Sequence, residues 1–250
     1  MAFTDAKLII FDLDSTLAES KSKLTPAMTE LVQNLLRKKK VGVISGGNFP
    51  QFEKQFIASF NDPECFGNLY LLPTTGARLY VYINNTWSLV YSKDLTPSEK
   101  ERIKDAFSEV FLKVEYEMPE EVHGELIQDR DSQITFSALG QDAPLDQKST
   151  WDPDHKKREE MVRELKKIIP EFSIEIGGTT SIDITSHGID KATGIESLQK
   201  YLELTDEEVI FVGDAIFPGG NDYPAVSTGV ECIKVKDPSD TVRLIQSWLN

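Results

Sequence analysis

The chain has 250 residues and a formal net charge of −14, with 27% charged and 40% hydrophobic residues. This composition is typical of a globular protein, and the length suffices for one large or two small domains. Nucleic acid is an unfavourable partner, because phosphate backbones are bound by clustered lysine and arginine. The apolar run near the N-terminus has only four residues, so we expect neither a signal peptide nor a membrane span.

The two cysteines, Cys65 and Cys232, lie far apart in the sequence and form no Cys-x-x-Cys pair. Neither a zinc site nor a disulfide framework is therefore indicated. A reducing, cytoplasmic compartment fits this usage of cysteine.

The first expected strand covers residues 8–11, an apolar run too short for a helix and without polar alternation. Asp12 and Asp14 follow, and their spacing of two points both carboxylates to the same side of an extended backbone. Open α/β sheets bind ligands at the carboxyl ends of such strands. An aspartate after a strand is also commonly a helix cap or a turn residue, so these two residues alone leave both interpretations open.

Strand and helix patterns alternate through the first part of the chain. In chain order we expect a helix at 26–40, a strand at 41–44 ending in Ser45-Gly46, a helix at 50–60, a strand at 69–72, and a hairpin of strands 78–83 and 87–91. Two successive strand–helix units indicate a parallel, doubly wound sheet.

The pattern then changes to helix, two strands, helix, two strands. The expected elements are a helix opened by a capping box at 96–99, strands at 126–129 and 133–138, a polar stretch at 140–149, a helix starting at Asp152-Pro153, and strands at 173–176 and 181–184. This order predicts an inserted α+β domain at about 93–187, with residues 1–92 and 188–250 forming the core.

The doubly wound pattern resumes after the insertion. We expect a helix at 191–202, a strand at 209–212 followed by Gly213-Asp214, a loop at 217–222, a short helix, a strand at 232–235, and a last helix. The fold class is therefore α/β, a doubly wound, Rossmann-like parallel sheet with an inserted α+β cap.

Polar groups follow three of the buried strands, namely Asp12 with Asp14, Ser45, and Asp214. Parallel strands present their carboxyl ends at one edge, so these groups can converge. Three carboxylates would repel one another unless a cation lay among them. An all-oxygen set with few protein ligands suits Mg²⁺, which also binds substrate phosphate.

The motif Asp12-x-Asp14-x-Thr16 after an apolar strand resembles the first motif of the haloacid dehalogenase superfamily of phosphoryl-transfer enzymes. Residues 177–183, 188–191, 213–214 and 218–222 are similar to segments of its subfamily IIB, the phosphomannomutase and sugar-phosphatase branch. The resemblance implies the same doubly wound core with an inserted cap.

The resemblance also implies roles for the core residues. Asp12 is the expected nucleophile, which becomes an aspartyl-phosphate, and Asp14 is the expected acid and base for the sugar oxygen. The expected Mg²⁺ ligands are Asp12, Asp214 and the backbone carbonyl of Asp14. The phosphoryl group is expected to be bound by Ser45 and Lys191, with Gly46 beside them. Asn221 and Asp222 are expected to assist near the metal.

In the resembled branch, residues matching Ser181 and Asp183 contact the sugar, and arginines bind the distal phosphate. Arg130 matches the first cap arginine, whereas Gln141 occupies the second position, Lys148 falls near the third, and Lys21 replaces an arginine of the first loop. A lysine neutralises a phosphate but lacks the bidentate fork of arginine. A mutase depends on this clamp more than a hydrolase does, so the departures favour a phosphatase.

We therefore expect a Mg²⁺-dependent phosphohydrolase acting on sugar phosphates such as hexose phosphates. The first alternative is a phosphomannomutase that interconverts mannose 1- and 6-phosphate, and the second is a non-catalytic phosphosugar-binding protein. A dinucleotide-dependent dehydrogenase is disfavoured, because no Gly-x-Gly-x-x-Gly follows the first strand. The expected partner is a phosphorylated sugar, with no nucleic acid or membrane, and analogy to the resembled mutases suggests a cap-mediated homodimer.

Overall fold

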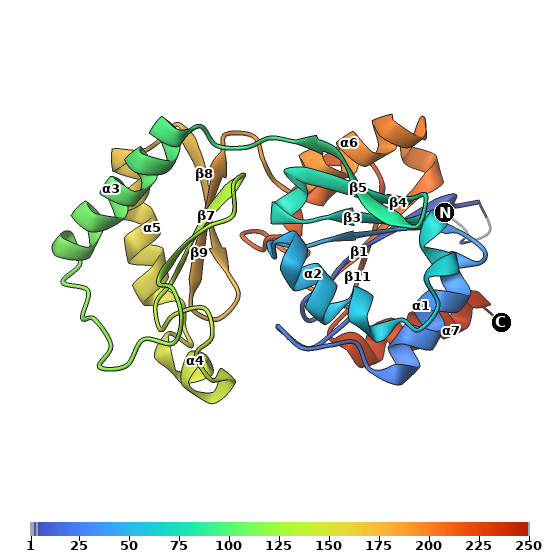
Figure 1. The fold of residues 1–250 in the computed structure, drawn as a ribbon, viewed down its shortest axis with the longest axis horizontal. Coiled ribbons are helices and arrows are strands. Elements are labelled where there is room, and N and C mark those ends of the chain that lie inside the picture. Colours follow the sequence, from blue (N-terminus) through green and yellow to red (C-terminus); the bar gives the residue numbers. More distant parts are fainter. Residues whose placement is uncertain (1–2, 4, 250) are drawn as a thin grey trace. The chain divides into compact units, whose positions relative to one another are not determined.

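The computed structural model describes residue 3 and residues 5–249. The chain folds into two compact units: Lys93–Ile189 forms one, which we call the inserted unit, and the flanking segments, up to Ser92 and from Asp190 onward, form the other, the core unit (Figure 1). Within the described part, none of the helices has the length and apolar character needed to cross a membrane.

The core unit contains a seven-stranded sheet in the order β11-β10-β1-β2-β3-β4-β5. Its strands are β1 (Leu8–Asp12), β2 (Lys40–Ile44), β3 (Leu69–Leu72), β4 (Arg78–Ile83), β5 (Thr86–Ser92), β10 (Val209–Gly213) and β11 (Glu231–Lys234). The strands from β11 to β3 pair in parallel, and β4 and β5 add an antiparallel hairpin at one edge. Strand β1 lies between β10 and β2, so the ends of three parallel strands meet where the first acidic motif begins.

Helices cover both faces of this sheet, as its doubly wound pattern requires. They are α1 (Pro26–Leu36), α2 (Phe49–Gln55), α6 (Lys191–Leu202) and α7 (Pro238–Leu249). Alternate residues of β1 serve the two faces: Ile9 and Phe11 pack with α1, α2 and α7, whereas Leu8 and Ile10 pack with α6 (Figure 1). The predicted fold class is confirmed by this arrangement.

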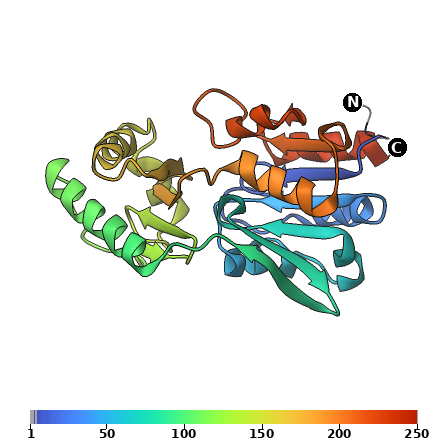
Figure 2. The same cartoon turned by 90° about the horizontal axis from the view of Figure 1, so that it is seen from above.

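The inserted unit contains a four-stranded antiparallel sheet in the order β6-β7-β9-β8. Its elements are α3 (Pro97–Lys113), β6 (Ile127–Asp129), β7 (Gln133–Ser137), α4 (Leu145–Trp151), α5 (Lys156–Ile168), β8 (Phe172–Gly177) and β9 (Ser181–Ser186). Helices α3 and α5 pack on one face of the sheet, against apolar residues such as Phe136 and Ile182 (Figure 2). The alternate residues of β7 and β9 are polar and occupy the other face.

The structure corrects the expectations for residues 140–155. Residues 140–149 were expected to be a polar stretch, but the structure forms α4 there, and the next helix begins at Lys156 instead of Asp152. The Asp152 carboxylate accepts hydrogen bonds from the backbone N–H groups of Lys157 and Arg158, so it precedes the helix as a loop residue.

The helix expected over residues 50–60 ends at Gln55 and gives way to the short 3₁₀ helix η1 (Ile57–Ser59). The Gln55 carbonyl accepts a hydrogen bond from the backbone N–H of Leu24 and another from the Ser59 hydroxyl. These bonds occupy the carbonyl that would otherwise continue the α-helical ladder. The apolar stripe still packs, because Phe52 and Phe56 are both fully buried in the core.

Candidate active site

Asp12 is the last residue of β1 and is 4% exposed. One of its carboxylate oxygens, Oδ1, accepts a hydrogen bond from Nζ of Lys191 at 2.5 Å. Lys191 is the first residue of α6 and also reaches Oδ1 of Asp222, again at 2.5 Å. A single buried ammonium group therefore links two buried carboxylates that are far apart in the sequence.

The position of Lys191 follows from how α6 begins. Asp190 caps the helix by accepting from the backbone N–H of Thr193 at 2.8 Å, and the Thr193 hydroxyl in turn accepts from the Asp190 N–H. One turn into the helix, Gly194 lies against Gly76, where a Cβ on Gly76 would be 2.6 Å from the Gly194 Cα. The two glycines thus let the first turn of α6 approach the loop after β3, which fixes the place of Lys191.

Asp214 completes a cluster of three carboxylates. It follows β10 directly, and one oxygen each of Asp12, Asp214 and Asp222 lie within 4.8 Å of one another. Asp214 accepts a hydrogen bond from the Thr16 hydroxyl at 3.2 Å, and Asp222 accepts one from the Ala215 N–H at 2.9 Å. The loops after β1 and β10 are therefore tied together at the carboxyl ends of adjacent strands.

The donor set of this cluster fits a hard divalent cation. Burial raises the pKa of Asp12 well above its usual range, and the charges of Asp222 and Asp14 add to this effect, while Lys191 opposes it. Burial and Asp222 likewise raise the pKa of Asp214. The cluster combines three carboxylates with a single lysine, so negative charge is in excess when the carboxylates are ionised. Mg²⁺, which binds through oxygen ligands, would compensate that excess.

Lys191 itself carries a positive charge at neutral pH. Its burial alone would lower its pKa, but the carboxylates of Asp12 and Asp222 outweigh burial and raise the pKa above its ordinary value. The ammonium group is therefore a fixed donor to Asp12.

Asp14 lies beside the cluster and is held by different partners. Its Oδ1 accepts from the backbone N–H of Lys21 at 2.6 Å, and its Oδ2 accepts from the Ser45 hydroxyl at 3.3 Å. Ser45 follows β2, is buried, and accepts a hydrogen bond from the N–H of Gly47 at 3.2 Å, with Gly46 between them half-buried. The structure thus groups Asp14 and Ser45, and Lys21 contributes its backbone to them. The roles of Ser45, Gly46 and Lys21 in binding a phosphoryl group remain predictions.

Two site features were not anticipated from the sequence. The backbone N–H groups of Thr74 and Thr75, both at positive φ, donate to the carbonyls of Gly47 and Ser45 and so hold the loop after β2. The Thr16 hydroxyl donates to Asp214, although Thr16 was expected only as part of the first motif. Left-handed threonines leave no sequence signal, because β-branched residues avoid this conformation.

Of the remaining predicted metal-site residues, Asp222 is fully buried in the cluster, whereas Asn221 is exposed. Asp222 owes its place to Gly213, because a Cβ at that position would be 2.4 Å from the Asp222 carboxylate. Asp222 is therefore part of the cluster, and the metal-site role of Asn221 stays a prediction.

The predicted sugar-contacting residues lie on the polar face of the inserted sheet. Asp183 accepts from the Thr135 hydroxyl at 2.8 Å, and Thr135 accepts from the Gln133 amide at 2.9 Å. The hydroxyls of Ser137 and Ser181 are 3.2 Å apart. Gln133, Thr135 and Ser137 were missed as site candidates, although their alternation with apolar residues in 133–138 was the signal that could have found them.

The predicted phosphate-binding residues of the inserted unit are engaged with glutamines. Arg130 donates from Nε to the Gln128 side chain at 2.7 Å, and Lys148, which is buried, donates from Nζ to the Gln141 backbone carbonyl at 2.7 Å. Position 141 therefore contributes a carbonyl to Lys148 here. The amide nitrogen of the Gln141 side chain is buried without a hydrogen-bond partner among the described residues.

A family model described as haloacid dehalogenase-like hydrolase matches residues 9–242. The chain belongs to this family. Its curated relatives include the phosphomannomutase of Encephalitozoon cuniculi, 28% identical over 100% of this chain and 96% of the relative, and phosphomannomutase 2 of Dictyostelium discoideum, 27% identical over 96% of each. The phosphomannomutase of Spinacia oleracea is 27% identical over 97% of this chain and 96% of that relative.

Solved structures agree in fold. A C-terminally truncated IMP-nucleotidase of Plasmodium falciparum aligns with a TM-score of 0.75 and 19% identity, over 99% of this chain and 73% of that one. The protein SMU.1108c of Streptococcus mutans aligns with a TM-score of 0.62 and 16% identity, over 98% and 99%. At these identities the likeness concerns the fold alone. The family prediction is confirmed, and between the two enzymatic alternatives the curated relatives favour the mutase over the expected phosphohydrolase.

Proposed function

We propose that the protein transfers the phosphoryl group of a sugar phosphate by way of an aspartyl-phosphate on Asp12, in the manner of a phosphomannomutase. The observation that carries the proposal is the buried Asp12 carboxylate, bound to Lys191 and within 4.8 Å of Asp214 and Asp222. The curated relatives that span nearly the whole chain support the choice of a mutase.

The geometry divides the work among the core residues. Lys191 holds one oxygen of Asp12, so the other oxygen is available to attack phosphorus. Asp14, fixed by Lys21 and Ser45, donates a proton to the departing sugar oxygen and takes one from the acceptor hydroxyl. Mg²⁺ bound by Asp12, Asp214 and Asp222, with the backbone carbonyl of Asp14, would neutralise the negative charge of the phosphoryl oxygens.

The inserted unit is proposed to supply sugar recognition. Ser181 and Asp183 present hydroxyl and carboxylate oxygens that suit sugar hydroxyls, and Arg130 and Lys148 carry the positive charge that suits a second phosphate. A cytoplasmic location and a homodimer through the inserted unit belong to the same proposal and rest on analogy with the mutases.

A sugar phosphatase is the second candidate, and one observation favours it. Gln141 stands where the resembled mutases have an arginine, and its carbonyl takes the Lys148 ammonium group. Among the predicted phosphate-binding residues of the inserted unit, Arg130 alone has the bidentate fork that holds a distal phosphate in a fixed orientation. A sugar bisphosphate would then dissociate before it returned its phosphate.

One assay separates the candidates. The protein is incubated with mannose 1-phosphate, Mg²⁺ and a catalytic amount of glucose 1,6-bisphosphate, and ³¹P NMR follows the sugar phosphates and inorganic phosphate. Conversion to mannose 6-phosphate with less than one inorganic phosphate per ten turnovers supports the mutase. Stoichiometric inorganic phosphate supports the hydrolase and contradicts the mutase.

Controls address the non-enzymatic alternative. Chelation of Mg²⁺ and the substitution Asp12→Asn should each abolish turnover, while Asp237→Asn, at an exposed aspartate in the loop before α7, should leave it unchanged. Binding of mannose 6-phosphate by wild type and Asp12→Asn alike, with no turnover of any phosphosugar tested, would indicate a phosphosugar-binding protein instead.

A further inference from the structure

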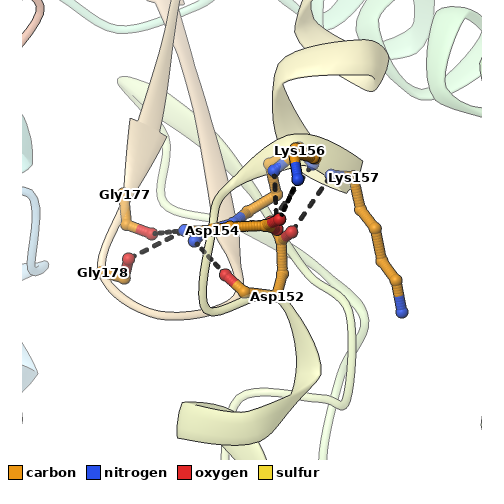
Figure 3. A network of polar contacts seen from close by, with 7 residues as sticks. Asp152, Asp154, Lys156, Lys157, Gly177 and Gly178 are labelled. Atoms are coloured by element: carbon orange, nitrogen blue, oxygen red, sulfur yellow. Dashed lines mark hydrogen bonds and ion pairs between the residues drawn. The ribbon is translucent and has the colours of Figure 1, made fainter.

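The inserted unit contains a fully buried ion pair that the proposed chemistry does not use. The side chains of Asp152 and Arg158 are both 0% exposed, and Nε of Arg158 donates to Oδ2 of Asp152 at 2.8 Å. Asp152 also accepts from the backbone N–H groups of Lys157 and Arg158 at 3.0 and 3.2 Å (Figure 3). The pair therefore joins the loop after α4 to the first turn of α5.

Arg158 also holds the turn between β8 and β9. Its Nη1 donates to the backbone carbonyls of Gly177 at 3.0 Å and Gly178 at 2.8 Å (Figure 3). Gly177 pairs with Ser181 in the sheet, and a Cβ on Gly177 would be 2.5 Å from the Asp183 carboxylate. The turn that Arg158 holds is thus in direct register with Ser181, and it leaves no room for a side chain between Gly177 and the Asp183 carboxylate.

Asp152 extends the same network to Lys148. It is the residue after α4, and Lys148 lies one helical turn before it on that helix. Nη2 of Arg158 donates to the Asp152 backbone carbonyl at 3.3 Å, so both the side chain and the main chain at the end of α4 are held. One guanidinium group therefore fixes the helix that carries Lys148 and the turn that leads to Ser181.

Stability alone does not account for such a pair. Removing two charges from water is costly, and apolar residues of similar volume often replace a buried ion pair without loss of stability. The planar fork of arginine, by contrast, sets the directions of its bonds to four acceptors on three residues at once. The ion pair therefore fixes the positions of the groups bonded to Arg158, which an apolar pair would not do.

We propose that Asp152 and Arg158 are positioning residues that set the placement of Lys148, Ser181 and Asp183 for substrate recognition by the inserted unit. The identity of the substrate as a sugar phosphate rests on the function proposed above; the positioning of the turn and of α4 does not.

The test compares two substrates in two variants. Arg158→Lys keeps the charge and loses the fork, and Asp152→Leu with Arg158→Met replaces the pair by apolar residues. In each variant we expect the KM for the sugar phosphate to rise about tenfold or more. The kcat for p-nitrophenyl phosphate, which presents only its phosphoryl group to Asp12, should stay within about twofold. Arg163→Met, at an exposed arginine on α5, is the matched control and should change neither.

Each outcome decides the proposal. An unchanged KM in a folded variant overturns it, as does an equal loss of kcat with both substrates. If circular dichroism shows the double variant unfolded, Arg158→Lys carries the test, and unfolding of both variants would make the pair a folding requirement and overturn the positioning role.

Hydrogen exchange gives a readout that is independent of the substrate. In Arg158→Lys we expect the amides of residues 178–181 to exchange at least tenfold faster, while those of α3 keep their protection. If wild type turns over no sugar phosphate, the proposed function fails, and this exchange result alone decides whether the pair positions the turn. Unchanged exchange at 178–181 would overturn that part.

Discussion

Lys191 shows how one side chain can organise several others at the residue scale. It is 1% exposed and bonded to two buried carboxylates, Asp12 and Asp222. Its own pKa is raised by these carboxylates against the opposing effect of burial. The lysine therefore keeps the proposed nucleophile in place and offsets part of its charge.

Replacing this lysine should be strongly destabilising. Lys191→Met leaves two buried carboxylates without their cation, and we expect a loss of about 3 kcal/mol or more in the free energy of unfolding. Urea denaturation monitored by circular dichroism measures it. Lys200→Met, at an exposed position in the last turn of α6, serves as the control and should cost less than about 0.5 kcal/mol. A loss below about 1 kcal/mol in Lys191→Met would contradict the electrostatic account.

Backbone strain beside the site predicts a substitution that raises the stability of the protein. Thr75 is buried with φ 57° and ψ 31°, a left-handed conformation that β-branched residues avoid. Asparagine adopts it more readily, so Thr75→Asn should stabilise the protein by about 1 kcal/mol and raise Tm by about 2–4 °C. Thr86→Asn, on the exposed edge strand, should bring no gain, and differential scanning calorimetry compares the two. A lower Tm in Thr75→Asn would show that the threonine side chain matters more than the strain.

At the scale of elements, the close approach of α6 to the loop after β3 places the proposed catalytic groups. The first turn of α6 reaches the 3₁₀ helix η3 (Thr74–Gly76) through two glycines, and Asp190 caps the same turn. Lys191 stands between the cap and the glycine contact. Movement of α6 would therefore displace its ammonium group from Asp12.

A single methyl group tests this packing. In Gly194→Ala the new Cβ would be 2.7 Å from Cδ1 of Ile44 and 3.0 Å from the Gly76 Cα. Overpacking costs about 1–3 kcal/mol, whereas the helix propensity of alanine returns about 1 kcal/mol, so we expect lower stability and lower kcat. Gly67→Ala has nothing within 4 Å and is the control. Steady-state kinetics and thermal melts measure both effects, and an unchanged kcat with raised Tm would refute the packing argument.

The buried pair of the inserted unit predicts a pH dependence at the element scale. Burial alone would raise the pKa of Asp152, but the hydrogen bonds from Arg158 and from two backbone N–H groups lower it below the ordinary value. A carboxyl group with a lowered folded-state pKa stabilises the protein above its ordinary pKa, and this contribution is lost as the pH falls through the folded-state value.

The comparison is between wild type and the double variant Asp152→Leu with Arg158→Met. Urea denaturation at several values from pH 6 to pH 3 should show the difference in unfolding free energy moving against wild type below about pH 4, because only wild type must protonate Asp152. Other carboxyl groups titrate in both proteins and cancel in the difference. A difference that stays constant over this range would contradict the lowered pKa.

At the scale of the whole molecule, residue patterns predicted much of the fold and part of the candidate site. The apolar runs at β1, β2 and β10 indicated buried parallel strands, and the acidic residues after β1 and β10 indicated a cation site, because strand ends share one edge. The three clustered carboxylates include Asp222, which the sequence pattern placed in a loop and which only the family resemblance assigned to the metal site.

Features that depend on tertiary contacts were not predicted from the sequence. Arg158 lies in a lysine- and glutamate-rich helix, and nothing in the sequence indicates that it is fully buried. Besides Asp152, its partners are two carbonyls in a turn nineteen and twenty residues away. Helix α4 was missed because it is short and mostly polar, and its buried Lys148 is recognisable only with the Gln141 carbonyl in view. Propensity is a weak guide where packing decides the outcome.

The most direct test of the account is to trap the phosphorylated enzyme. Wild type is mixed with ³²P-labelled mannose 1-phosphate and Mg²⁺, quenched in acid within milliseconds, and digested for peptide mapping by mass spectrometry. We predict one label per chain, on the peptide that contains Asp12, and none in Asp12→Asn. Label on any other residue, or turnover in Asp12→Asn at a rate near that of wild type, would contradict the assignment of Asp12 as nucleophile.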